Sequence, residues 1–437
     1  MKPRTHTYVT MNVYWFGLAF MWNALHPIVL PALLLRFVPE GLKNTYLGAL
    51  TFIGLVLAMV VQPWAGSLSD RTHTRWGRRR PWMVGGTFLS LLFLALMAGA
   101  QDLWLLAAGY LLLQLASNAA HGPAQGLIPD LVSPDRRGLA SGIKNLFDMG
   151  GLVVTSLVAG QLMGGDNPVL AFAAIAVVLA ASTATTVLTT QEPVSEVTGT
   201  AADSQAAGKS SRRPWRADLI RYPVYTWVLI SRFLILLGIY VVQGFAQYYI
   251  RDWLDVPNPA VVTGNLMAAI GVALTLLVFP AGWLSDRIGR WPLNIAAGVA
   301  ASVGIFLLVL ARSVTSVYVF GSIIGMATGV FLSVNWALAT DLIPPDEGGK
   351  YLGLSNLATA GAGAASRLGG PLIDGLNAVL PGAFIGYPAT FAVAALATLT
   401  GAALMANARR RVLSSAADSE AVEEQLTTES PSEMGAL

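Results

Sequence analysis

The chain has 437 residues, of which 54% are hydrophobic and only 12% are charged, with a formal net charge of +3. Soluble domains carry about 25% charged residues, so this composition argues against a water-soluble protein. The basic residues lie in loops beside apolar segments, which argues against nucleic-acid binding. Cysteine is absent and the four histidines lack metal-ligand spacing, so we expect neither disulfides, a metal site nor a cofactor.

Apolar runs of about 20 residues, long enough to cross a lipid bilayer, recur along the whole chain. Separating them at loop signals predicts an all-α membrane protein with twelve transmembrane helices. The predicted helices cover residues 11–37, 44–68, 82–100, 103–128, 138–163, 168–190, 222–250, 258–283, 293–311, 315–343, 350–376 and 383–407. The first run is too long for a signal-peptide core and is expected to be retained.

Two polar segments divide this pattern. The Ala-, Ser- and Gly-rich stretch 191–221 is predicted to link an N-terminal six-helix bundle, residues 1–190, to a C-terminal one, residues 222–408. The acidic residues 409–437 lack a sustained apolar face and are predicted to be a disordered tail. Of the 27 Lys and Arg residues, 20 fall on the side of the membrane that carries both termini and four on the other. This bias predicts cytoplasmic termini, and we expect a monomeric, multi-pass protein of the cytoplasmic membrane.

A short motif occurs in both predicted bundles. The sequence "GSLSDR" (66–71), followed by "GRRRP" (77–81), has a shortened copy in "GWLSDRIGRWP" (282–292). Beyond this loop, an offset of 211 residues relates "PDLVSPD" (129–135) to "TDLIPPD" (340–346). One offset that holds over several helices predicts that the second half is a copy of the first, as in transporters built from parallel repeats.

The repeated motif, in a chain of twelve predicted helices with a central linker, resembles the major facilitator superfamily. More narrowly, "SDRTHTRWGRRRP" (69–81) and "HGPAQGLIPDL" (121–131) resemble the sucrose-type proton symporters and the related glycoside-pentoside-hexuronide cation symporters. The resemblance implies two pseudo-symmetric bundles and symport of a sugar or glycoside with H+ or Na+ by alternating access. Where plant sucrose carriers have an Asp and an Arg in helix 4, this chain has Gln114 and Gln125, which leaves the sugar and the coupling ion open.

Charged residues beside the repeated motif are expected to form a gate. Exposed ion pairs contribute only about 0–1 kcal/mol each, so a network of them suits a latch between states that differ by a few kcal/mol. The alternative is that the arginines only fix the topology and contact anionic lipid. The expected gating residues are Asp70, Arg71, Arg78, Arg79, Asp130, Arg137, Asp286, Arg287 and Arg290.

Polar side chains recur on single faces of the predicted helices 1, 4, 7 and 10, which the resemblance places around a central cavity. Polar groups inside a membrane are costly and tend to face a cavity or a partner. Amide, imidazole and indole groups suit a polyhydroxylated substrate, and hydrogen bonding between helices is the alternative. The candidate substrate-binding residues are Trp22, Asn23, His26, Gln114, Asn118, His121, Gln125, Tyr240, Gln243, Gln247, Asn335 and Trp336.

Three charged residues, Lys144, Asp148 and Arg232, are predicted deep inside helices and are the candidate ion-coupling residues. Lys144 and Asp148 are four residues apart and can pair along one helix. Asp148 is expected either to load and release a proton as this pair opens or to form a static bridge. His26 and His121 are the other proton-carrying candidates.

An ion gradient is the expected energy source, because the sequence contains no G-x-x-x-x-G-K-[ST] nucleotide-binding motif. No enzymatic activity is expected. The alternative function is proton-coupled export of drugs or amphipathic metabolites. Arg367, in "SRLGGP", is expected toward the outer third of its helix as a structural or outer-gate residue.

Overall fold

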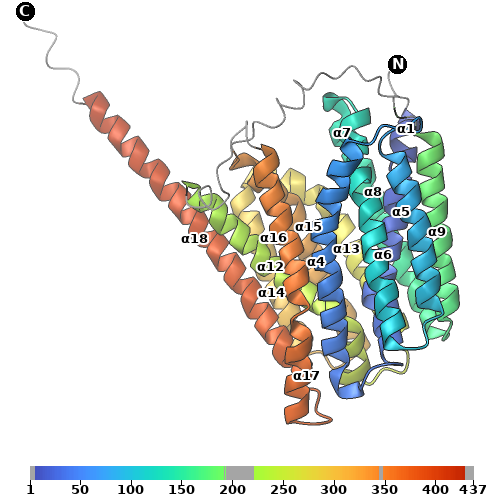
Figure 1. Ribbon diagram of the computed structural model, residues 1–437. Coiled ribbons are helices and arrows are strands. Elements are labelled where there is room, and N and C mark those ends of the chain that lie inside the picture. Colours follow the sequence, from blue (N-terminus) through green and yellow to red (C-terminus); the bar gives the residue numbers. More distant parts are fainter. Residues whose placement is uncertain (1–4, 191, 193–220, 344–347, 429–437) are drawn as a thin grey trace, which may run out of the picture.

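The computed structural model describes residues 5–190, 192, 221–343 and 348–428, and within these ranges every regular element is a helix (Figure 1). The first half contains α1 (Thr5–Thr10), α2 (Val13–Ala24), the π-helix η1 (Leu25–Val29), α3 (Leu30–Leu34), η2 (Glu40–Leu42), α4 (Lys43–Asp70), α5 (Arg80–Ala98), α6 (Leu103–Gln125), α7 (Leu127–Leu131), η3 (Pro134–Arg136), α8 (Arg137–Gly164) and α9 (Pro168–Thr189). The second half contains α12 (Pro223–Trp253), α13 (Pro259–Ile288), α14 (Arg290–Val309), α15 (Val314–Asp341), α16 (Gly348–Ser366), α17 (Gly369–Val379) and α18 (Gly386–Thr428).

Local signals set the ends of several helices. Asp102 accepts a hydrogen bond from the backbone N–H of Leu105 (2.9 Å) at the start of α6, and Ser313 forms a capping box with Ser316 at the start of α15. These side chains satisfy N–H groups that a helix leaves unpaired in its first turn. Gly289, with φ of +90°, makes the tight turn between α13 and α14, where a side chain would be strained.

The described residues contain eleven helices long and apolar enough to cross a membrane, one fewer than the sequence predicts. The difference lies in the predicted helix 350–376, which is split into α16 and α17 at Arg367. Two glycines and a proline follow this residue in "RLGGP", and both residue types disfavour a continuous helix. The first predicted helix is also interrupted, by the π-helix η1 around Pro27.

The same helix pairings occur in both halves. In the first half α2 packs on α8 and α9, α6 packs on α4 and α5, and α5 packs on α9. In the second half α12 packs on α16 and α18, α15 packs on α13 and α14, and α14 packs on α18. The halves meet along α8 and α13 and along α4, α16 and α17. The internal repeat predicted from the motif is therefore also a repeat of helix packing.

Small residues bring α8 and α13 close together between the halves. A Cβ placed on Gly160 would lie 3.1 Å from the Cα of Gly264, and one placed on Gly264 would lie 2.3 Å from the backbone oxygen of Ser156. Small residues let transmembrane helices approach closely, so the backbones themselves form this part of the interface.

The chain after the last bundle helix differs from the prediction. Disorder was expected from residue 409, but α18 continues as a helix to Thr428 and runs past the bundle (Figure 1). Extending an existing helix needs no new nucleation, and this segment is rich in Ala and Glu, which favour helix. Apart from Glu192 and Arg221, the predicted linker 191–221 lies outside the described residues, as do residues 429–437.

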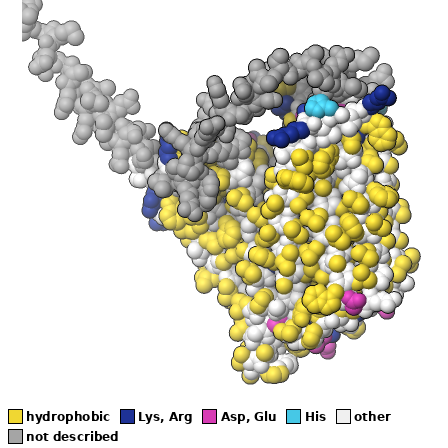
Figure 2. Space-filling view, in the orientation of Figure 1, with side chains coloured by type: hydrophobic (Ala, Val, Ile, Leu, Met, Phe, Trp, Pro, Cys, Tyr) yellow, Lys and Arg dark blue, Asp and Glu magenta, His cyan; other side chains and the backbone are white. Residues whose placement is uncertain are grey.

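The lateral surface is apolar, as a membrane protein requires (Figure 2). Basic side chains gather at the end of the bundle that carries the repeated motif, and acidic side chains are visible at the other end. We call the end with the loops 71–79 and 132–136 the motif end, and the end with the loop 254–258 the opposite end.

Candidate functional site

Arg79 holds together the first copy of the motif. Its side chain is only 7% exposed and contacts two carboxylates, Asp70 (2.5 Å) and Asp130 (3.0 Å). It also donates to Ser69 Oγ (3.2 Å). Arg78 makes a second, more exposed pair with Asp130 (2.6 Å). The end of α4, the start of α5 and α7 are thus joined through one buried guanidinium.

The second copy repeats only part of this network. Arg290 forms an ion pair with Asp341 and donates to the backbone oxygen of Ala337 (2.7 Å). Arg290 and Asp341 follow Arg79 and Asp130 at the 211-residue offset, so the sequence repeat could have identified Asp341, which was not among the expected gating residues.

The remaining expected gating residues take other roles. Arg137 donates to the backbone oxygens of Pro129 (3.0 Å) and Val132 (3.2 Å), and the Arg287 guanidinium lies 3.8 Å from the ring centre of Trp283. Asp286 lines a surface cleft beside Arg290 and Asp341, and neither Asp286 nor Arg71 forms an ion pair with a described residue. Both residues are exposed, so water solvates them in place of a partner.

Glu192 binds the first copy of the motif, although no pattern in the sequence singles it out. Its carboxylate accepts hydrogen bonds from the backbone N–H groups of Arg78 (2.7 Å), Arg79 (2.9 Å) and Arg80 (3.0 Å) at the start of α5. A carboxylate is favourable at a helix N-terminus, where unpaired N–H groups and the helix dipole both attract it. The carboxylate lies so close to Gly77, at φ of +98°, that a Cβ there would be 2.5 Å from an Oε.

The opposite end is closed by a buried ion pair between the two halves. Lys43, at the start of α4, lies 2.8 Å from Asp252 of α12, and both side chains are less than 5% exposed. Lys43 also contacts Glu40, which lies 2.8 Å from Arg251. The Tyr387 hydroxyl donates to the Asp252 carboxylate (2.5 Å). We call Lys43, Asp252 and the groups around them the Lys43 clasp.

A second contact between the halves lies beside the Lys43 clasp. Asp374 of α17 accepts hydrogen bonds from the Asn44 side chain (2.8 Å) and the backbone N–H of Thr45 (2.6 Å). The first turn of α4 has no capping side chain at Leu42, so a carboxylate of the other half supplies the cap. Opening the opposite end would remove this cap.

The π-helix η1 completes the closure. The Gln247 amide donates to the backbone oxygens of Pro27 (2.8 Å) and Ile28 (3.0 Å), and the Tyr248 hydroxyl donates to that of Pro31 (2.8 Å). All hydrogen bonds and ion pairs described between the two halves lie at or toward the opposite end. At the motif end, by contrast, a cavity of about 760 Å³ separates α4 and α6 from α16. This structure is therefore open toward the motif end.

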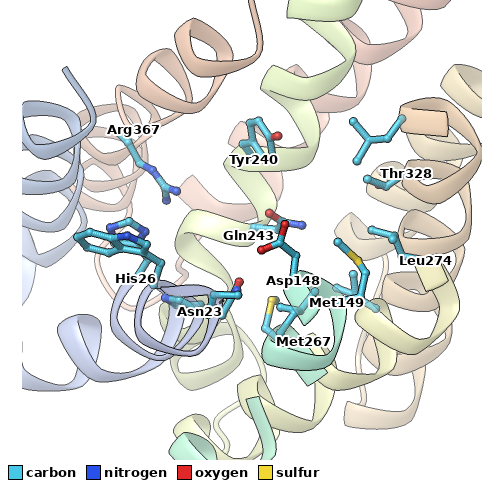
Figure 3. Close-up of a pocket in the computed structure, with 16 residues that line it drawn as sticks. Asn23, His26, Asp148, Met149, Tyr240, Gln243, Met267, Leu274, Thr328 and Arg367 are labelled. Carbon is cyan, nitrogen blue, oxygen red and sulfur yellow. Dashed lines mark hydrogen bonds between the residues drawn. The ribbon is translucent and has the colours of Figure 1, made fainter. Parts of the chain in front are cut away.

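A central cavity of about 430 Å³ lies between the two halves (Figure 3). Residues of α2, η1, α8, α12, α13 and α15 line it, together with Arg367 from the break between α16 and α17. Five of the candidate substrate-binding residues are in its wall: Trp22, Asn23, His26, Tyr240 and Gln243. Arg367, His26 and Asn23 lie on one side of the cavity, and Met149, Met267 and Leu274 lie on the other.

The polar stripe of α6 does not line the central cavity, which corrects the sequence analysis. Gln114 donates to the Tyr110 hydroxyl (2.7 Å), Asn118 donates to Gln114 Oε1 (2.9 Å), and Gln62 donates to Asn118 Oδ1 (2.6 Å). Only the C-terminal half of the stripe reaches a cavity: His121 and Gln125 line the one at the motif end. Hydrogen bonds within α6, together with the bond from Gln62 of α4 to Asn118, thus satisfy its buried members.

Three further candidates also lie outside the wall of the central cavity. Gln247 bonds to η1, and Trp336 is 40% exposed and lines neither the central nor the motif-end cavity. Asn335 accepts a hydrogen bond from Arg232 (2.5 Å), which also donates to Thr359 (2.9 Å). Arg232 therefore crosslinks α12, α15 and α16 and is not near Asp148, which lines the central cavity.

The predicted pair of Lys144 and Asp148 is present. Their side chains lie 2.8 Å apart, and Asp148 lines the central cavity. The Lys144 ammonium group lies 4.0 Å from the ring centre of Trp15, which also makes a T-shaped contact with the His121 ring (5.1 Å between ring centres). Because the aromatic face is a second favourable contact for the cation, Lys144 can stay in place when Asp148 changes partner.

Arg367 is nearer the substrate path than expected. It lines the central cavity, and its side chain forms no hydrogen bond or ion pair with a described residue. Its guanidinium packs against α12 at Gly244, where a Cβ would lie 2.0 Å from it, so a glycine is needed to leave room for the arginine. A guanidinium that is largely removed from water and unpaired is costly, so water or a ligand in the cavity must hydrogen-bond to it.

Two matching bundles around a central cavity, closed at one end and open at the other, are the architecture of a membrane transporter. The chain belongs to the Major Facilitator Superfamily, whose sequence profile matches residues 7–367. This confirms the resemblance read from the repeated motif. The chain is a multi-pass protein of the cell membrane and a transporter, not an enzyme.

Comparisons with individual proteins agree with this assignment. The inner membrane symporter YicJ of Escherichia coli is 26% identical over 352 residues, which cover 75% of this chain and 72% of YicJ. The sucrose transport protein SUC3 of Arabidopsis thaliana is 27% identical over 125 residues, only 24% of this chain and 21% of SUC3. Among solved structures, a D-xylose-proton symporter superposes with a TM-score of 0.68 at 16% identity, covering 90% of this chain and 97% of that one.

Proposed function

We propose that this chain is a secondary transporter that moves a sugar or glycoside through the cytoplasmic membrane by alternating access, in symport with H+ or Na+. The observation that carries the proposal is the central cavity, where Tyr240, Gln243 and Arg367 have no side-chain hydrogen bond to a described residue. Polar groups in a membrane need partners. The hydroxyl groups of a sugar can donate to the amide oxygen of Gln243 and accept from the Tyr240 hydroxyl and the Arg367 guanidinium. The relatives SUC3, a sucrose transport protein, and YicJ, a symporter, support sugar transport and symport.

The basic motif end is placed in the cytoplasm, following the distribution of Lys and Arg. In this orientation the Lys43 clasp closes the outer side, and substrate would leave toward the cytoplasm. The chain is proposed to work as a monomer, with the Arg79 and Arg290 networks acting as the inner gate in the state that is closed to the cytoplasm.

Uptake of radiolabelled sugars into proteoliposomes tests this function, and Gln243→Ala tests whether the central cavity binds the sugar. We expect saturable uptake that collapses with the ion gradient, and a half-saturation constant raised roughly tenfold in Gln243→Ala, as for the loss of one or two hydrogen bonds to substrate. Gln247→Ala, one helical turn away but bonded to η1, should leave that constant within about threefold of wild type while altering the rate. Extrusion of amphipathic dyes without sugar uptake would instead support the export alternative, which the apolar side of the cavity favours.

Asp148→Asn is expected to separate substrate movement from coupling. The amide keeps the shape of the side chain but cannot exchange a proton at Asp148, so counterflow exchange of substrate should persist while gradient-driven accumulation is lost. Both activities can be measured in the same proteoliposomes, with Asp166→Asn, an exposed carboxylate at the opposite end, as the control. Accumulation at the wild-type level in Asp148→Asn would mean that the pair of Asp148 and Lys144 is a static bridge and that Asp148 does not carry the coupling proton.

A further inference from the structure

The central cavity has two chemically different walls. Asn23, His26, Gln243 and Arg367 belong to the polar wall, which is formed by α2, η1, α12 and the α16–α17 break. The facing wall is formed by α8, α13 and α15. It is lined by Met149, Leu152, Met267, Ile270, Leu274 and Leu332, and its one charged residue is Asp148 of α8, which is paired with Lys144. Figure 3 shows the two walls on opposite sides of the same space.

Apart from the Asp148 carboxylate, which is paired with Lys144, the apolar wall offers a ligand little to hydrogen-bond. Thr328 lies among its members, but the Thr328 hydroxyl already donates to the backbone oxygen of Ile324 (2.7 Å). Met267 and Leu274 are less than 8% exposed, so these side chains are held in place by their neighbours. A substrate carrying hydroxyl groups all round would lose hydrogen bonds to water on this side without replacing them.

We infer that the preferred substrate is a glycoside with an apolar aglycone, an aryl or alkyl group, rather than a free sugar or an oligosaccharide that is polar throughout. The sugar ring lies against the polar wall, and the aglycone lies against the methionines and leucines of α8, α13 and α15. Methionine side chains adapt to aromatic surfaces, which suits a wall that receives a ring. This inference rests on the proposed function and specifies the substrate class of the same cavity.

Inhibition of sugar uptake in proteoliposomes by matched compounds tests the inference. We expect phenyl glycosides of glucose or galactose to inhibit at concentrations roughly tenfold or more below their methyl counterparts, since the phenyl ring buries additional apolar area. Phenol alone should not compete at comparable concentrations. Direct uptake of the radiolabelled phenyl glycoside then shows that it is a substrate and not only an inhibitor.

Leu274→Ala and Met267→Ala should each reduce the phenyl-over-methyl preference by about threefold to tenfold, with little change for the methyl glycoside. Leu276→Ala is the control, because Leu276 is on the same helix but is 67% exposed on the outer surface. The two wall variants are tested separately, and a size-exclusion profile of each shows whether it is folded. Equal potency of phenyl and methyl glycosides would overturn the inference and leave sugar transport intact. Equal potency of phenol and phenyl glycoside would also overturn it, and transport of no sugar or glycoside would remove the proposed function itself.

Discussion

Replacing Arg79 by leucine is expected to lower the free energy of unfolding by about 2–3 kcal/mol, because a buried guanidinium that hydrogen-bonds to two carboxylates and to Ser69 is lost at once. Asp70 and Asp130 would both lose their buried contact, and α4, α5 and α7 would lose the group that joins them. Transport per molecule of folded protein should also fall, since the same network is proposed as the inner gate. Thermal unfolding in detergent and uptake normalised to folded protein measure the two effects.

Arg78→Leu is the matched control for this prediction. The Arg78 side chain is 42% exposed, and Asp130 is the one described carboxylate with which it pairs. An exposed pair of this kind contributes about 0–1 kcal/mol, so the unfolding transition should hardly move. Equal destabilisation by the two substitutions would show that burial of Arg79 is not what makes the motif important.

Replacing Lys43 by methionine should shift the protein from the state open at the motif end toward the state open at the opposite end. The buried pair with Asp252 exists only while the opposite end is closed, and losing one member costs about 3–5 kcal/mol in that state alone. Each 1.4 kcal/mol changes a population ratio by about tenfold, so the ratio should change by roughly 100-fold or more. Spin-label distances across the opposite end, measured by double electron–electron resonance, report this ratio.

Two further variants make the Lys43 prediction specific. Arg36→Met removes a surface pair with Asp166, which lies in the same half, and should leave the distance distribution unchanged. The double variant Lys43→Met, Asp252→Leu replaces the pair by apolar groups and should return part of the population to the closed state. A wild-type distribution in Lys43→Met would mean that the clasp does not hold the halves together.

The sequence was sufficient for eleven membrane-crossing helices and the repeat, because apolar runs and a duplicated motif are local signals. Arg79 was selected from the same motif, and it is the centre of the ion-pair network there. The stripe on α6 was read as one face correctly, but periodicity cannot say whether a polar face meets a cavity or the Tyr110 hydroxyl. The packing of the helices determines which of the two a polar face meets. In this structure Gln114 and Asn118 bond to each other and do not line the central cavity.

The contacts between the halves could not be predicted from the sequence, for a different reason. Lys43 and Asp252 are separated by more than 200 residues, and each looks like an ordinary charge at a helix end. Arg367 was expected as a structural or outer-gate residue, and the structure adds that it lines the central cavity. Its place in the cavity wall depends on packing between the halves, which the sequence does not report.

Thiol labelling of the central cavity tests the transport account most directly, and the absence of native cysteines makes it clean. A single cysteine at Met149, in the cavity wall, should react with a membrane-impermeant reagent in inside-out vesicles, and a transported sugar should protect it. Adding Lys43→Met should make the same cysteine reactive in right-side-out vesicles. Labelling of this cysteine that changes neither with the sugar nor with Lys43→Met would contradict a central, alternately accessible substrate site.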